Sequence, residues 1–146
     1  MQFNLAGERI LLTLWVGSLW AIGYIVAPTL FSMLDDRQLA GNVAGQLFHI
    51  ISYVGLGCGV LLLLSVFKRL GLHWRIWVLI AMLVFVVCME FILQPMMQQL
   101  KLQGLVEGSA EKATFGMLHG VSAILYMANA LMGLGLVAFG LQQKRK

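Results

Sequence analysis

The fold class is decided by residues 76–97, which read IWVLIAMLVFVVCMEFILQPMM. This stretch carries one charged side chain, Glu90, among apolar neighbours. An α-helix rises about 1.5 Å per residue, so a stretch of this length can cross a hydrocarbon core of roughly 30 Å. Because backbone groups in lipid must hydrogen bond within the chain, the stretch predicts a membrane-spanning helix.

Three more apolar runs lie on either side of it, at residues 10–34, 43–67 and 115–141. The 146-residue chain is 60% hydrophobic and 11% charged, and its mean hydropathy is +0.88. Soluble proteins carry about 25% charged residues, so the composition argues against a soluble enzyme, a disulfide-stapled secreted module and a disordered chain. The sequence predicts one all-α membrane domain over residues 1–146, a four-helix bundle with spans at about 10–34, 43–67, 76–97 and 115–141.

Lys and Arg are distributed unevenly between the two ends of the predicted bundle. By the positive-inside rule, the richer end faces the cytoplasm, so both termini are predicted to be cytoplasmic. The net charge of +4 then reflects topology, and the predicted partner is the lipid bilayer rather than nucleic acid. The richer end holds Arg9, Lys68, Arg69, Arg75, Lys144, Arg145 and Lys146, and the other end holds Arg37, Lys101 and Lys112.

Cysteine, proline and glycine add local expectations. Cys58 and Cys88 fall inside apolar runs, so they are predicted to be packing residues rather than a disulfide. Pro28 and Pro95 are predicted to kink or end their helices. The loop after the third span either continues that helix to about Gly104 or lies along the interface.

Glycines four apart allow close helix contacts, within one bundle or in a homo-oligomer. These pairs are Gly41 and Gly45, Gly55 and Gly59, and Gly116 and Gly120.

Three ionisable side chains, His49, Glu90 and His119, fall inside three different spans. Counted along the helices, all three lie roughly 6–11 Å below the membrane boundary opposite the termini. Such residues are rare in spans and usually face the bundle interior, so this layer is the candidate site. Further polar side chains accompany the layer at helical spacing, namely Tyr53, Gln94, Ser122, Tyr126 and Asn129.

Several functions are open for this layer. Two imidazoles with nearby methionines favour binding or transport of a transition metal, copper above others, with His49, Glu90 and His119 as the metal site. Two histidines on separate helices could instead hold a haem, and a Glu–His pair could relay protons. The non-catalytic alternative is a membrane scaffold whose polar layer fixes helix packing. No phosphate loop, nucleophile elbow or Ser–His–Asp set is present, which favours a non-enzymatic role.

Several phrases together resemble the bacterial family labelled domain of unknown function 4149, which is related to eukaryotic transmembrane protein 205. The resemblance covers nearly the whole chain and implies four helices in the bacterial cytoplasmic (inner) membrane. The eukaryotic relative is associated with resistance to a platinum drug, which implies handling of metals or metallodrugs. The phrases are Leu14-Trp15-Val16-Gly17, Ala27-Pro28-Thr29-Leu30-Phe31, Ala40-Gly41 through Leu47-Phe48, Pro95, and Phe115-x-x-Leu118-His119-Gly120-x-Ser122.

Only part of the candidate site is carried over by this resemblance. His119, with Gly120 and Ser122, stands at matching motif positions. In the eukaryotic relatives, the second-helix histidine stands one turn later, where this chain has Tyr53, and the pattern near Glu90 differs as well. The resemblance therefore does not imply that all three ionisable residues form one inherited site.

Overall fold

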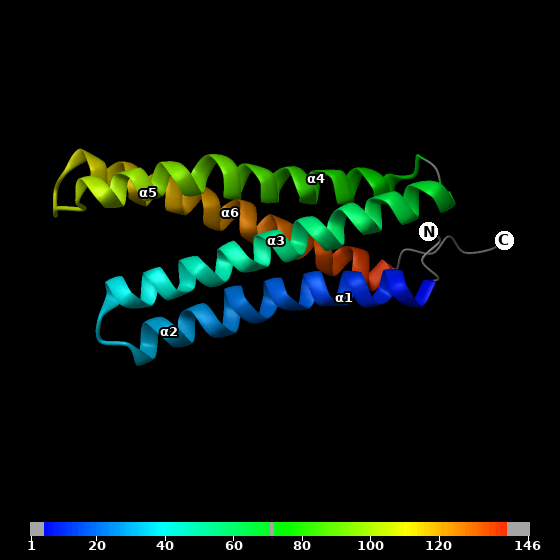
Figure 1. Cartoon of the computed structure of the whole chain (residues 1–146), viewed down its shortest axis with the longest axis horizontal. Coiled ribbons are helices and arrows are strands. Elements are labelled where there is room, and N and C mark those ends of the chain that lie inside the picture. Colours follow the sequence, from blue (N-terminus) through cyan, green and yellow to red (C-terminus); the bar gives the residue numbers. More distant parts are fainter. Residues whose placement is uncertain (1–4, 71, 140–146) are drawn as a thin grey trace.

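The computed structural model describes residues 5–70 and 72–139, which fold into four long helical arms (Figure 1). No strand occurs in these residues, so the predicted all-α four-helix architecture is confirmed. Two of the arms contain a π-helical turn, labelled η. The arms are α1 (Leu5–Ala21) with η1 (Ile22–Val26) and α2 (Ala27–Met33), then α3 (Arg37–Leu70), then α4 (Trp74–Cys88) with η2 (Met89–Leu93) and α5 (Gln94–Gln103), and lastly α6 (Ala110–Phe139).

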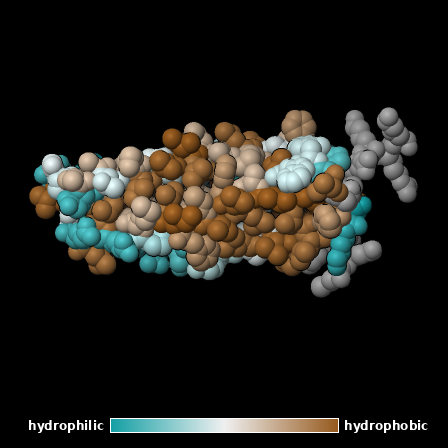
Figure 2. Space-filling view, turned by 90° about the horizontal axis from the view of Figure 1, so that it is seen from above, coloured by the Kyte–Doolittle hydropathy of each residue, from teal (hydrophilic) through white to brown (hydrophobic). Residues whose placement is uncertain are grey.

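Each arm is long and apolar enough to cross a membrane. The four candidate spans are Leu5–Met33, Arg37–Arg69, Trp74–Gln103 and Ala110–Phe139, each containing or closely matching one predicted apolar run. Figure 2 shows apolar residues covering the middle of the molecule, with hydrophilic residues gathered toward its two ends. The chain is a multi-pass membrane protein.

The arms pack in a closed ring. Helix α1 packs against α3, α3 against α4, α4 against α6, and α6 back against α1. Consecutive arms run antiparallel, so the start of α1 and the end of α6 lie at the same end of the bundle (Figure 1). The core between the arms is apolar and includes the fully buried side chains of Trp15, Leu62, Leu79, Met82 and Leu136.

The prolines do not end their helices, contrary to one of the expected outcomes. Pro28 lies in the first turn of α2 and Pro95 in the first turn of α5, directly after η1 and η2. Proline lacks an N–H and its ring clashes with the carbonyl four residues earlier. The extra residue of a π-helical turn relieves both problems, and such turns are frequent at functional sites. Each of the two arms thus crosses the bundle with one widened turn.

The glycine pairs differ in what surrounds them. A Cβ atom at Gly55 would lie 2.5 Å from Nε1 of Trp15, and one at Gly59 would lie 2.8 Å from the same ring. This pair therefore serves packing between α1 and α3 within the chain. No atom lies within 4 Å of a Cβ placed at Gly45, Gly116 or Gly120, whose contacts within a homo-oligomer stay a prediction.

The ends of the bundle agree with several sequence predictions. The third helix continues to Gln103 and stops at Gly104, whose φ of 91° favours glycine.

Cys58 and Cys88 are free thiols. Lys144, Arg145 and Lys146, on which the predicted orientation partly depends, lie outside the described residues. The orientation of the termini in the membrane stays a prediction.

Candidate functional site

A pocket of about 510 Å³ lies between the four arms. All four arms contribute to its walls, which are mostly apolar. Small-molecule sites typically measure about 300–1,000 Å³ and are apolar with a few placed polar groups. The polar side chains that line this pocket are Tyr24, His49, Ser52, Glu90, Gln94, His119, Ser122, Tyr126 and Asn129.

The strongest polar feature of the pocket is the contact between Glu90 and His49. Oε1 of Glu90, on the π-helical turn η2, is hydrogen bonded to Nδ1 of His49 on α3. The Glu90 side chain is 6% exposed, whereas the His49 side chain is 46% exposed. A buried carboxylate requires such a partner, because leaving it unpaired in an apolar interior is costly. The pair joins α3 to the third arm.

His119 reaches the same pocket from α6. Its ring stacks on Phe115, with centroids 6.1 Å apart and planes 8° from parallel. Within residues 5–70 and 72–139, no three His, Cys, Asp or Glu side chains form a group that could hold a metal ion. The structure thus brings two of the three predicted ligands into contact, while His119 lines the same pocket and its part in a metal site stays a prediction.

Aromatic side chains also line the pocket. Tyr126 lies between two other rings, with its centroid 5.1 Å from that of Phe48 and 6.4 Å from that of Tyr24. Its hydroxyl donates to the carbonyl oxygen of Leu19 at 2.6 Å, which fixes the ring against α1. The indole N–H of Trp20 donates in turn to the carbonyl oxygen of Ala130. These bonds hold α6 against the first arm.

Asn129 is the most unusual polar residue in the pocket wall. It is fully buried, and neither Oδ1 nor Nδ2 has a hydrogen-bond partner. Buried amides in proteins are normally bonded, and an unsatisfied one costs about 1–3 kcal/mol. Both amide atoms are covered, so a molecule inside the pocket would reach them only if the Asn129 side chain turned.

A second depression, of about 300 Å³, lies on the other side of the Glu90–His49 pair. His49, Glu90 and Gln94 line both cavities, so they form a wall between them. We call this depression the groove; its remaining polar walls include Gln46, Tyr53 and Gln98. Tyr53 meets His49 edge-on, with centroids 4.9 Å apart. Of the predicted accompanying side chains, Gln94, Ser122, Tyr126 and Asn129 therefore line the pocket, while Tyr53 lines the groove.

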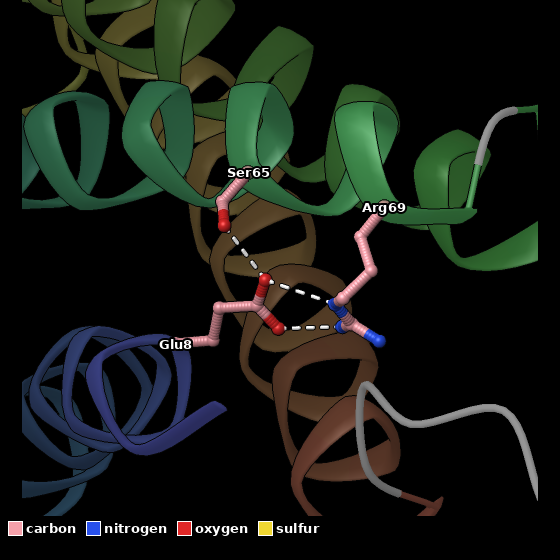
Figure 3. A network of polar contacts seen from close by, with 3 residues as sticks. All are labelled: Glu8, Ser65 and Arg69. Atoms are coloured by element: carbon pink, nitrogen blue, oxygen red, sulfur yellow. Dashed lines mark hydrogen bonds and ion pairs between the residues drawn. The ribbon is translucent and has the colours of Figure 1, made fainter. Parts of the chain in front are cut away.

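The sequence interpretation missed a polar network at the opposite end of the bundle. Glu8 precedes the first predicted span, which begins at residue 10, but it lies within α1 and is fully buried. Figure 3 shows its carboxylate facing Ser65 and Arg69 of α3. Oε1 accepts hydrogen bonds from Oγ of Ser65 at 2.7 Å and Nε of Arg69 at 3.3 Å, and Oε2 accepts one from Nη2 of Arg69 at 2.6 Å. The four-residue spacing of Ser65 and Arg69 on one helix face was the available signal.

A comparison with protein families gives one match. A family model described as domain of unknown function (DUF4149) matches residues 10–105. The matched range includes His49 and Glu90, whereas His119 and the rest of α6 lie beyond it. No curated protein and no solved structure gives a significant match to the chain.

Proposed function

Because the chain belongs to the DUF4149 family, whose description names no activity, we propose its function from the geometry of the membrane interior. The protein binds a small, mainly apolar molecule in the pocket between its four arms. Glu90 and His49 provide one polar contact to this molecule, and Asn129 provides a second polar contact deeper in the bundle. This function is non-enzymatic binding, or transport that begins with binding.

The observation that carries the proposal is the 510 Å³ pocket itself. Ten residues separate His119 from Asn129, so the wall contributed by α6 is about 15 Å long. A polar layer that only fixed helix packing has no need of such a space, because unfilled space forfeits van der Waals contacts that packed side chains make. An elongated apolar molecule would restore those contacts and could form a hydrogen bond with the unpaired amide of Asn129.

The test compares a pocket-filling variant with a matched control on the same helix. Ala123 lines the pocket, whereas Ala138 is exposed on α6 outside it. Ala123→Phe adds a ring to the pocket, and Ala138→Phe adds the same ring to the outer surface. Thermal unfolding of each purified protein is measured with three probes of nearly equal shape: 1-methyl-4-phenylpyridinium, 4-methylbiphenyl and biphenyl-4-carboxylate.

We expect at least one probe to raise the unfolding midpoint of the wild type and of Ala138→Phe, and to have little effect on Ala123→Phe. A ligand at 100 times its dissociation constant stabilises a protein by about 2.7 kcal/mol, which such a measurement resolves. The proposal fails if no probe stabilises the wild type, or if Ala123→Phe responds as strongly as the control.

The same purified protein tests the narrower metal and haem hypotheses. Elemental analysis after loading with copper, zinc or nickel measures any bound ion, and an absorption spectrum reveals any haem. One ion per chain that is lost in His119→Ala would replace our proposal with a metal site at His49, Glu90 and His119. A Soret band would replace it with a haem site.

A further inference from the structure

The residues that line the pocket include one with a fixed charge, and that charge is negative. Among the described residues that line it, Glu90 is the one carboxylate, and no Lys or Arg is present. We propose that the molecule bound in the pocket is a lipophilic organic cation, whose charge pairs with Glu90 and whose apolar body lies against the aromatic wall. This inference rests on the proposed function and adds the chemical class of the ligand.

Glu90 is placed to exchange one partner for another. Among the described residues, His49 is the side chain that bonds to it, through Oε1. The imidazole also lines the groove and is nearly half exposed. It can therefore turn toward the groove without being buried elsewhere. A cation in the pocket could then neutralise the carboxylate, which must keep a partner because it is 6% exposed.

The aromatic wall suits a positive charge. A cation over an aromatic face is attracted by the ring quadrupole, and the attraction increases when water is excluded. Tyr24 and Phe48 each contact the ring of Tyr126, and all three rings line the pocket. Within the described chain, the cation–π contacts involve other rings, Arg75 on Trp74 and Lys101 on Phe115. The pocket rings are thus available to a ligand.

Other titratable groups around Glu90 leave this charge balance in place. The pocket also receives His49 from α3, His119 and Tyr126 from α6, and Tyr24 from η1. On the groove side, Tyr53 is the further titratable side chain. Among the described residues that line the pocket or the groove, Glu90 is the one member of the Asp, Glu, Lys and Arg set, so it determines the sign of the site. A turn of the Asn129 side chain would bring its unpaired Oδ1 to the pocket as an acceptor for an N–H group of the ligand.

The three probes named above test this class directly, because they have nearly the same shape and differ mainly in charge. We expect 1-methyl-4-phenylpyridinium to bind the wild type at least tenfold more tightly than 4-methylbiphenyl, and biphenyl-4-carboxylate to bind most weakly. Glu90→Gln keeps the shape of the side chain and should reduce the cation preference at least tenfold. His49→Gln removes the competing imidazole, so affinity for the cation should stay equal or rise.

The outcomes separate this inference from the proposed function. If the neutral probe binds as tightly as the cation, and Glu90→Gln changes neither affinity, the proposed ligand class is wrong while the proposed pocket function stands. If no probe binds the wild type, the proposed function fails as well. Size-exclusion profiles and unfolding midpoints without ligand confirm that Glu90→Gln and His49→Gln are folded. Should Glu90→Gln not fold, a wild-type preference for the neutral or anionic probe still overturns the inference.

Discussion

Removing the guanidinium of Arg69 should destabilise the bundle, because it leaves Glu8 buried as an unpaired charge. Arg69 donates two of the three hydrogen bonds to this carboxylate, and Ser65 donates the third. A hydrogen bond to a charged group contributes about 1.5–3 kcal/mol, so two of them total about 3–6 kcal/mol. The Arg69 side chain is 31% exposed, so we take the lower end of this range. The expected cost of Arg69→Met is about 3 kcal/mol.

The assay is reversible unfolding in mixed detergent micelles, followed by circular dichroism and fitted to a free energy of unfolding. Arg69→Met keeps the aliphatic stem and removes the charge. Glu8→Met removes the carboxylate, and the double variant removes both. Because the double variant buries no charge, it should lose less stability than Arg69→Met alone. Lys68→Met changes an exposed neighbour and should stay within about 0.5 kcal/mol of the wild type.

Two results would refute this reasoning. One is a cost below about 1 kcal/mol for Arg69→Met, which would mean that Glu8 is solvated or neutral without its partner. The other is additivity of the two single substitutions within about 0.5 kcal/mol, which would mean that the side chains do not interact.

Two further predictions use the same unfolding assay. Gly55→Ala places a Cβ 2.5 Å from Nε1 of Trp15 and should cost about 1–3 kcal/mol by overpacking, whereas Gly57→Ala meets no atom within 4 Å and should be neutral or stabilising. Equal effects at the two glycines would contradict the close contact. Asn129→Leu removes a buried amide without partners and should leave stability unchanged or raise it by about 1 kcal/mol. A loss above that size would show that the amide is bonded in the folded protein.

Hydropathy and helix geometry predicted much of this fold. Four spans follow from the apolar runs. The third helix ends at Gly104, which was one of the two alternatives predicted for the loop that follows this span. The shared depth of His49 and Glu90 correctly indicated that they could meet. Depth fixes the position along the bundle axis but not the direction around each helix. Depth alone therefore could not say that the His119 ring would stack on Phe115.

The remaining features depend on contacts between distant parts of the chain. Glu8 resembled a boundary residue because a charge near the end of an apolar run usually marks one. Its burial follows from partners 57 and 61 residues later. The π-helical turns before Pro28 and Pro95 were missed because proline alone predicts a kink, and the widened turn is one of several ways to absorb it. The pocket itself is a property of all four arms together.

The order in which the helices are synthesised gives the two buried carboxylates a further consequence. Chains are made from the N-terminus, and Glu8 finds Arg69 as soon as the second arm enters the membrane. Glu90 arrives after His49 is already in place. Both carboxylates can therefore have a hydrogen-bond partner before α6 is made. Helix α6 supplies Ser122, Tyr126 and Asn129 to the pocket wall. Before α6 is made, the three inserted arms therefore hold both carboxylates with their partners, but the pocket is not yet closed. Insertion of the last helix would complete it.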